Sequence, residues 1–143
     1  MPDFNYHYDV EVRFSDLDAL GHVNNARFLT YMEQARINYF KDLGLWSGNS
    51  LYEIGFILAD AHVNFRSPIL FGQAVSVQLG ITRLGNKSMT MHYRMVDKNS
   101  GRELSDGSTV LVTYDYHASA TVPIPPDWRA AIRRFEGLAE DNA

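Results

Sequence analysis

Two carboxylates, Asp16 and Asp18, lie just ahead of a segment whose residues predict a long amphipathic helix. The first backbone N–H groups of a helix lack partners within the helix, and the macrodipole makes that end positive. Such an end can bind an oxyanion and favours the charged form of a nearby carboxylate. Acyl transfer requires a base or nucleophile beside an oxyanion site, and a carboxylate can be that base or nucleophile. The sequence therefore indicates acyl-transfer chemistry at the start of this helix.

The helix itself is predicted from spacing. Asn24 or Asn25 suits the N-cap, and Gly44 suits the end. Between them, apolar residues recur three and four positions apart: Phe28, Leu29, Met32, Ala35, Tyr39, Phe40 and Leu43. Tyr31 and Ile37 add apolar side chains off this stripe. We therefore expect other elements to cover the helix on more than one side.

Alternation of apolar and polar residues predicts five strands, each with one buried face. The first spans residues 7–14 and buries Tyr8, Val10, Val12 and Phe14. The others span residues 57–65, 75–81, 89–95 and 110–116. In the last of these, the alternating apolar residues are Val110, Val112, Tyr114 and Tyr116. Turn residues between the last four strands, such as Gly85 and Asn86, predict antiparallel pairing.

The order β-α-β-β-β-β predicts an α+β fold, in which a five-stranded antiparallel sheet curls around the one long helix. After three prolines, Asp127 is expected to cap a short C-terminal helix. Residues 1–143 are expected to form one domain. Because the sheet has two edges, we expect self-association. The alternative is a monomer whose edges are covered by residues 46–55 and the C-terminal helix.

Composition excludes several classes of function. The net charge of the 143 residues is −4 and the basic residues are scattered, which argues against a nucleic-acid partner. No apolar run approaches the ~18 residues of a membrane span, and the first residues do not resemble a signal peptide. The absence of cysteine fits a reducing cytoplasm. Five histidines without ligand-like spacing give no support to a metal site.

One string carries a family resemblance. Residues 16–25 read Asp-Leu-Asp-Ala-Leu-Gly-His-Val-Asn-Asn, and Phe28, Tyr31, Glu33, Ala35 and Arg36 follow. This pattern resembles the hotdog-fold thioesterases of the 4-hydroxybenzoyl-CoA thioesterase-like group. Residues 64–68 and 84–88 agree with it, and the likeness spans the whole chain. It implies hydrolysis of acyl-CoA without metal or organic cofactor, in a homodimer that often pairs into a homotetramer and holds its active sites at the dimer interface.

The resemblance also implies roles for individual residues. Asp18 acts as nucleophile on the thioester or as general base for water. The backbone N–H at Asn25 or its neighbours holds the oxyanion. His22 and Asn24 are candidates for positioning Asp18 or contacting the thioester, with stabilisation of the loop as the equal alternative, and Gly21 would let the backbone approach the substrate. Three further residues lie where turns could meet the phosphates of CoA, and solvated turn charges explain them equally well: Arg66, Lys87 and Ser88.

Several residues near this string have structural interpretations instead. Local pattern favours Asp16 as a turn and cap residue. A calcium loop fails at Leu20 and Arg27, where ligands are required. The three-residue spacing of Glu33 and Arg36 favours an ordinary helix ion pair over a catalytic role. Relatives often carry His or Tyr in place of Asn25, so their substrate preference does not transfer.

Two alternative functions stay open at this point. A hotdog protein could bind acyl-CoA without turnover, or cleave the thioester of an acyl carrier protein, since plant enzymes of that kind carry a similar His-Val-Asn-Asn stretch. A hotdog hydratase would need a catalytic His with a partner acid in a different string. Aliphatic, aromatic and hydroxylated acyl groups all remain candidates.

Overall fold

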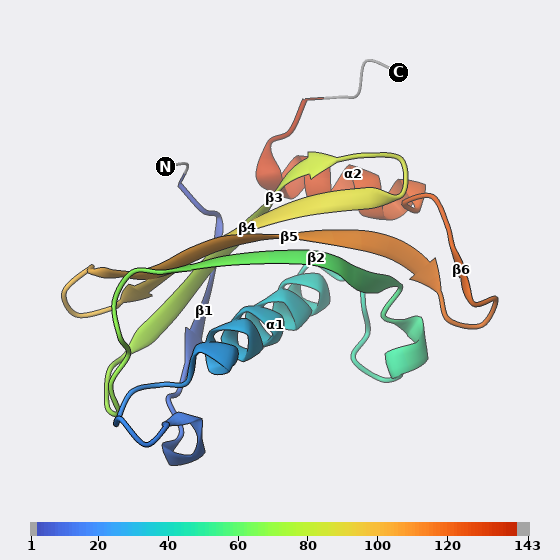
Figure 1. Cartoon of the computed structure of the whole chain (residues 1–143). Coiled ribbons are helices and arrows are strands. Elements are labelled where there is room, and N and C mark those ends of the chain that lie inside the picture. The colour runs from blue at the N-terminus through green and yellow to red at the C-terminus, as the bar shows by residue number, and fades with distance from the viewer. Residues whose placement is uncertain (1–2, 140–143) are drawn as a thin grey trace.

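The computed structural model describes residues 3–139. A curved antiparallel sheet lies across the long helix α1 (Asn25–Asp42), as Figure 1 shows. The remaining elements are β1 (Tyr6–Val10), η1 (Phe14–Asp16), η2 (Leu51–Glu53), β2 (Phe56–Phe65), β3 (Val75–Leu84), β4 (Ser88–Asp97), β5 (Glu103–Asp115), β6 (Ala120–Thr121) and α2 (Pro126–Glu136). This architecture confirms the predicted α+β hotdog fold. In the described part of the chain, no helix is both long and apolar enough to span a membrane.

The strands follow the order β1-β3-β4-β5-β2, and each pair is antiparallel. The short strand β6 joins β5 through Tyr114 and Asp115, which the sequence analysis did not predict. β1 and β2 are therefore the outer strands of the main sheet. In Figure 1 the whole length of β2 lies along one side of the sheet, next to α1.

The helix α1 forms as its sequence predicts. Its N-cap is Asn24, whose side chain accepts a hydrogen bond from the N–H of Ala26, and Gly44 follows the helix with φ of +78°. The prediction that the helix is covered on more than one side is confirmed, because Tyr31 is buried. Leu29, expected on the buried stripe, is instead exposed.

Buried side chains of the sheet meet α1 from β3 and β4. The predicted faces of both strands are confirmed, and each of their members is almost completely buried: Val75, Val77, Leu79, Ile81, Met89, Met91, Tyr93 and Met95. These residues form one cluster with Phe28, Met32, Tyr39 and Phe40 of the helix. The methionines are therefore part of the core.

The first predicted strand was too long. β1 ends at Val10, and the chain turns into η1 at Phe14. Phe14 was expected on the buried face but is 79% exposed. Its ring contacts only the edge of the Phe71 ring among the aromatic contacts of the described residues. Alternation of residue types continued past the point where pairing with β3 stops at Val10 and Val75.

The predicted face of the last strand was also wrong. Thr109, Leu111 and Thr113 are buried, whereas the expected Val110 and Val112 are only partly so. The register explains the difference, because Leu111 lies opposite the buried Met89 and Val110 lies opposite Thr90. The inner face of β5 carries buried threonines, so its residue types look like those of an exposed face. Alternation of apolar residues alone therefore selected the wrong side.

The helix α2 covers a free stretch of β3. Pairing with β1 ends at Leu79, and beyond it the N–H of Ile81 donates to Glu136 Oε2 at 2.8 Å. The same carboxylate oxygen accepts the Tyr39 hydroxyl at 2.6 Å, so one side chain links α1, β3 and α2. This covering of an edge by the C-terminal helix was one half of the predicted monomer arrangement.

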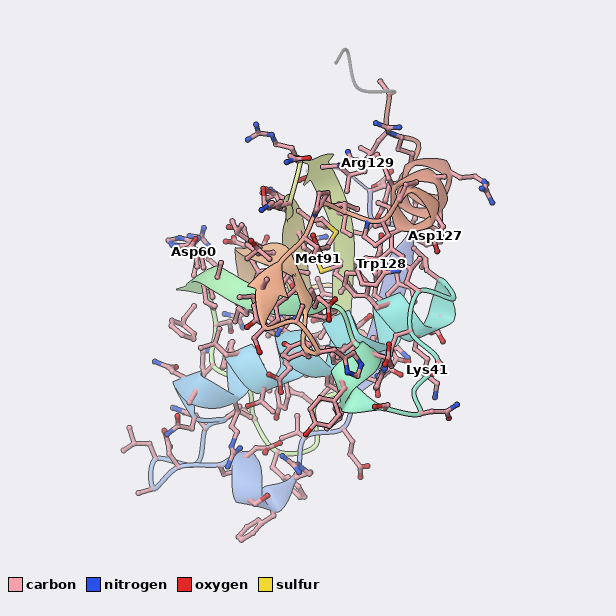
Figure 2. All side chains as sticks on the ribbon, turned by 90° about the vertical axis from the view of Figure 1, so that its right-hand side faces the viewer. Lys41, Asp60, Met91, Asp127, Trp128 and Arg129 are labelled. Carbon is pink, nitrogen blue, oxygen red and sulfur yellow. The ribbon has the colours of Figure 1, made fainter. Side chains whose placement is uncertain are left out.

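The start of α2 differs from its prediction. Pro125 occupies the N-cap without a side-chain hydrogen bond, and Asp127, expected as the cap, lies in the first turn. A carboxylate there still faces the positive end of the helix. Figure 2 shows Trp128 pointing from α2 toward the interior, where its ring lies 5.4 Å from that of Phe40.

Gly107 lies opposite Val63 in the pairing of β5 with β2. A Cβ at this position would lie 2.4 Å from the His62 carbonyl oxygen and 3.3 Å from Met32 Cε. Because a backbone oxygen cannot move aside cheaply, Gly107→Ala is expected to lower the free energy of unfolding by about 2–3 kcal/mol. Urea denaturation measures this change. Ser108→Ala on the same strand is the control and should change it by less than about 0.5 kcal/mol; equal effects would contradict the steric argument.

Candidate active site

The loop between η1 and α1 is held closed by its own backbone. The Asp18 N–H donates to the His22 carbonyl at 2.8 Å, and the Gly21 N–H donates to the Asp18 carbonyl at 3.0 Å. Gly21 has φ of +80°, which favours glycine, whereas a Cβ there would contact nothing within 4 Å. The Val23 N–H donates to the Ile69 carbonyl at 2.8 Å and thereby fastens the loop to the segment before β3.

Asp16 fixes this loop to the helix. Its side chain is fully buried, as expected of a structural residue, and it accepts the Tyr31 hydroxyl at 2.7 Å. It also accepts the Arg13 N–H and guanidinium, each at 3.0 Å, while Arg27 Nε lies 3.7 Å away. Burial raises the pKa of this carboxyl, but the bonds from Tyr31 and Arg13 outweigh burial and hold its pKa below the usual value.

Asp18 has a different environment from Asp16. Its Oδ1 accepts the Leu20 N–H at 2.9 Å, which orients the carboxylate. Within residues 3–139, Oδ2 has no hydrogen-bond partner. The side chain is half-buried and lines an open cleft. The loop thus positions a carboxylate with one oxygen available for chemistry.

The start of α1 supplies a hydrogen-bond donor to the same cleft. The Ala26 N–H bonds the Asn24 side chain at 2.9 Å, and the Arg27 N–H bonds the Asn24 carbonyl at 2.8 Å. The Asn25 N–H, first of the helix, has no partner among the described residues. It is therefore a helix-start donor of the kind that binds oxyanions.

The cleft has a volume of about 550 Å³ and lies between the start of α1 and the end of β2. It brings together five predicted site residues: Asp18, His22, Asn24, Asn25 and Arg66. Gly21 belongs to the same loop but does not line the cleft. Arg66 lies at the mouth, half exposed, with its Nε 3.0 Å from Asp106 Oδ2. A carboxylate, a helix-start N–H and a cation thus share one cleft.

Lys87 and Ser88 are not in this cleft. Lys87 lies in the β3–β4 turn and Ser88 is the first residue of β4, opposite Val112, while the cleft adjoins the other end of β2 at Phe65. Lys87 Nζ donates to the Thr121 hydroxyl at 3.3 Å. Their predicted contact with CoA therefore requires something beyond one copy of this chain.

The cleft has an apolar wall that was not predicted from the sequence. Phe28 and Phe65 meet edge to face with their ring centroids 5.0 Å apart, and both line it. Phe28 was assigned to the apolar stripe of the helix and Phe65 to the strand over residues 57–65, and both lie in segments that carry the family resemblance, but no local pattern distinguishes a cleft wall from core. Among residues 3–139, no group of three or more His, Asp or Glu side chains could hold a metal ion.

Arg36 has a role that its ion-pair assignment did not include. Its Nη2 lies 3.9 Å from Glu33, a long ion pair, and its Nη1 donates to the Tyr93 hydroxyl at 3.2 Å. That hydroxyl also bonds Thr109 at 2.7 Å, so the buried guanidinium links α1 to β4 and β5. Glu33 itself is exposed and does not line the cleft.

Comparisons with known proteins identify the family of this chain. The family model described as thioesterase-like superfamily matches residues 12–132. A thioesterase from Thermus thermophilus, solved in complex with coenzyme A and Zn, is 38% identical with a TM-score of 0.84 and covers 97% of this chain and 100% of its own. For a predicted thioesterase from Bacillus stearothermophilus the identity is 26%, the TM-score 0.82 and the coverage 91% and 95%. The long-chain acyl-CoA thioesterase FadM of Escherichia coli (strain K12) is 22% identical over 126 residues, which are 88% of this chain and 96% of that protein. The chain therefore belongs to the thioesterase-like superfamily and is a thioester hydrolase.

Proposed function

We propose that this chain hydrolyses acyl-CoA thioesters to the free acid and CoA, with Asp18 as the catalytic carboxylate. One observation carries the proposal: Asp18 Oδ2 and the Asn25 N–H both lack partners among the described residues, and both residues line one cleft. An acyl carbonyl between them would have a base or nucleophile on one side and an oxyanion donor on the other.

The reaction has two balanced routes through these groups. As general base, Asp18 takes a proton from water while the water oxygen attacks the carbonyl carbon. As nucleophile, its Oδ2 attacks instead and forms an anhydride, which water then hydrolyses. In both routes the Asn25 N–H stabilises the oxyanion, the C–S bond breaks, and the CoA sulfur leaves as a thiolate that takes up a proton. His22 and Asn24 line the cleft and are proposed to position Asp18 or the thioester.

A second copy of the chain is proposed to complete the site through β2. This strand has a neighbour only on the β5 side, and five consecutive residues in its middle, 58–62, are exposed. Figure 2 shows Asp60 at the margin of the molecule. Such an edge is a template for pairing, and a two-fold dimer would join two β2 strands antiparallel. Further pairing of dimers into a tetramer stays a prediction.

Antiparallel pairing of identical strands exchanges their ends. The Phe65 end adjoins the cleft, and the Phe56 end lies beside Thr113, whose N–H bonds the Lys87 carbonyl at 2.8 Å. The dimer would therefore bring Lys87 and Ser88 of the partner subunit toward the cleft, near Arg66. Arg66, together with Lys87 and Ser88 of the partner subunit, is proposed to bind the phosphates of CoA there. Gly21 is proposed to let the backbone of the Asp18 turn approach the substrate.

Lys87→Ala is expected to raise the KM for an acyl-CoA about two- to fivefold, because one exposed cation at an anion is worth at most about 1 kcal/mol. The KM for the same acyl group on N-acetylcysteamine, which lacks the phosphates, should stay unchanged. Steady-state kinetics on both substrates measures the difference. Lys98→Ala, which removes an exposed lysine paired with Asp9, is the control. Equal changes on both thioesters would contradict phosphate binding.

A screen of purified protein against short, medium and aromatic acyl-CoAs tests the proposed function, with a thiol-reactive dye detecting released CoA. Turnover is expected with at least one of them. Saturable binding of acyl-CoA without any turnover would favour the alternative of a binding protein. Turnover confined to acyl carrier protein would favour the other alternative, although an acidic chain offers little attraction to such an acidic partner.

A further inference from the structure

Two large apolar side chains project from η2, immediately ahead of β2. Leu51 is 75% exposed and Tyr52 is 68% exposed. Apolar side chains so exposed and adjacent in sequence indicate a surface that another group covers. The fold gives them no role in the core, since neither belongs to the buried cluster.

The position of η2 is fixed by contacts with its N-cap and with the turn after β5, and the Tyr52 ring lies 6.2 Å from the His117 ring. The Ser50 hydroxyl accepts the Tyr52 N–H at 3.3 Å, and Glu53 Oε1 lies 2.8 Å from His117 Nε2. Behind them, the Gly55 carbonyl accepts the Tyr114 N–H at 2.9 Å. The segment is thus attached to β5 and the turn after it. Its two apolar side chains are therefore held at the Phe56 end of β2.

The cleft has uncovered apolar surface at the opposite end of the same strand. Leu20 is 80% exposed and Phe65 is 48% exposed, and both line the cleft. Since β2 has ten residues, its two ends are about 30 Å apart. A chain's own η2 therefore cannot reach its own cleft.

Pairing of two β2 strands would remove this separation. Because the antiparallel arrangement exchanges ends, the Phe56 end of one subunit lies beside the Phe65 end of the other. The exposed apolar residues of η2 and those of the cleft would then face each other twice in each dimer. Both surfaces would lose their contact with water in the same association.

We infer that Leu51 and Tyr52 of the partner subunit form an apolar cover over the cleft. This cover favours thioesters with long apolar acyl groups over thioesters with small acyl groups such as acetyl. This inference rests on the proposed function and on the proposed dimer, and it adds the residues that select the acyl group. A longer acyl chain gains more buried area against such a cover than an acetyl group does. Leu51 and Tyr52 are thus specificity residues supplied in trans.

Cross-linking tests the placement without any need for activity. The chain has no cysteine, so Leu20→Cys combined with Tyr52→Cys introduces only two thiols. A short bis-maleimide is expected to join them between two chains, giving a covalent dimer on a denaturing gel. Asp9→Cys with Tyr52→Cys, which places one thiol on β1 at the other edge of the sheet, is the control. Absence of the dimer, or equal yield in the control, would overturn the inference.

Mixed dimers in which only one subunit keeps Asp18 test whether the partner subunit determines the preference for the acyl group. In the first, a wild-type chain pairs with a chain carrying Asp18→Asn, Leu51→Ser and Tyr52→Ser. In the second, a chain carrying Leu51→Ser and Tyr52→Ser pairs with a chain carrying only Asp18→Asn. The ratio of kcat/KM for decanoyl-CoA to that for acetyl-CoA is expected to fall about tenfold in the first dimer and to match wild type in the second.

The outcomes separate the two proposals. A loss confined to the second dimer, or equal ratios in both dimers, would overturn the cover in trans while leaving the hydrolase intact. A wild-type protein that hydrolyses no thioester would refute the proposed function. In that case the cross-linking result still decides whether η2 of one chain lies at the cleft of the other.

Discussion

Asp18→Asn is expected to lower kcat for acyl-CoA hydrolysis by at least about 100-fold, the lower end for the loss of a group that transfers protons. An amide cannot act as the base or as the nucleophile in either route. Its Oδ1 can still accept the Leu20 N–H, so the turn and the fold should persist. Because the change is nearly isosteric in an open cleft, KM should change far less than kcat.

The measurement is steady-state hydrolysis with the best substrate of the wild-type screen, together with thermal unfolding of both proteins. Asp127→Asn is the matched control, since Asp127 is an exposed carboxylate in the first turn of a different helix. It should retain wild-type kcat. Turnover by Asp18→Asn close to that of the wild type would eliminate Asp18 as the catalytic carboxylate.

Most of the fold could be predicted because apolar and polar residues alternate without interruption in its central strands. β3 and β4 alternate cleanly, and the helix α1 has a cap, an apolar stripe and a terminal glycine that agree with one another. In contrast, Thr109 and Thr113 occupy buried inner positions of β5 on either side of Leu111. Residue polarity alone could not identify that face.

In the candidate site, too, some residues could be predicted from the sequence and others could not. Asp18, His22, Asn24 and Asn25 are neighbours in sequence, so one turn ahead of a helix brings them together whatever the rest of the fold does. Arg66 reaches the cleft through tertiary structure, and its place followed only from the resemblance. Phe65 falls on the apolar face of the strand predicted over residues 57–65, because a strand pattern reports which face a residue is on. It does not report whether the helix extends far enough to cover it.

The predicted difference between the two carboxylates can be tested on stability. Asp16→Ala is expected to lower the free energy of unfolding by about 3 kcal/mol at neutral pH, because it removes a buried ion and leaves the Tyr31 hydroxyl without its partner. Tyr31→Phe, which removes one hydrogen bond from the same pair, should cost about 1 kcal/mol. Urea denaturation of both variants provides the measurement.

The double variant Asp16→Ala, Tyr31→Phe measures the contribution of the hydrogen bond between these two side chains. If the two side chains stabilise the loop through their mutual bond, its loss of stability should be smaller than the sum of the two single losses. Additive losses would mean that each residue acts separately. Asp18→Asn serves as the comparison, since its carboxylate accepts only one backbone N–H in the described chain and its replacement should cost less than about 1 kcal/mol.

Acid should reduce the contribution of Asp16 to stability. Its bonds to Tyr31 and Arg13 hold the pKa below its usual value despite burial, so the unfolded chain binds the proton more readily than the folded one. The stabilisation is therefore complete above the unfolded pKa of about 4 and is lost as pH falls through the lower folded pKa. The stability difference between the wild type and Asp16→Ala should accordingly be constant from about pH 5 to 7, by this linkage, and decrease below about pH 4. A difference that stays constant into that acidic range would show that the loop depends on the shape of Asp16 rather than on its charge.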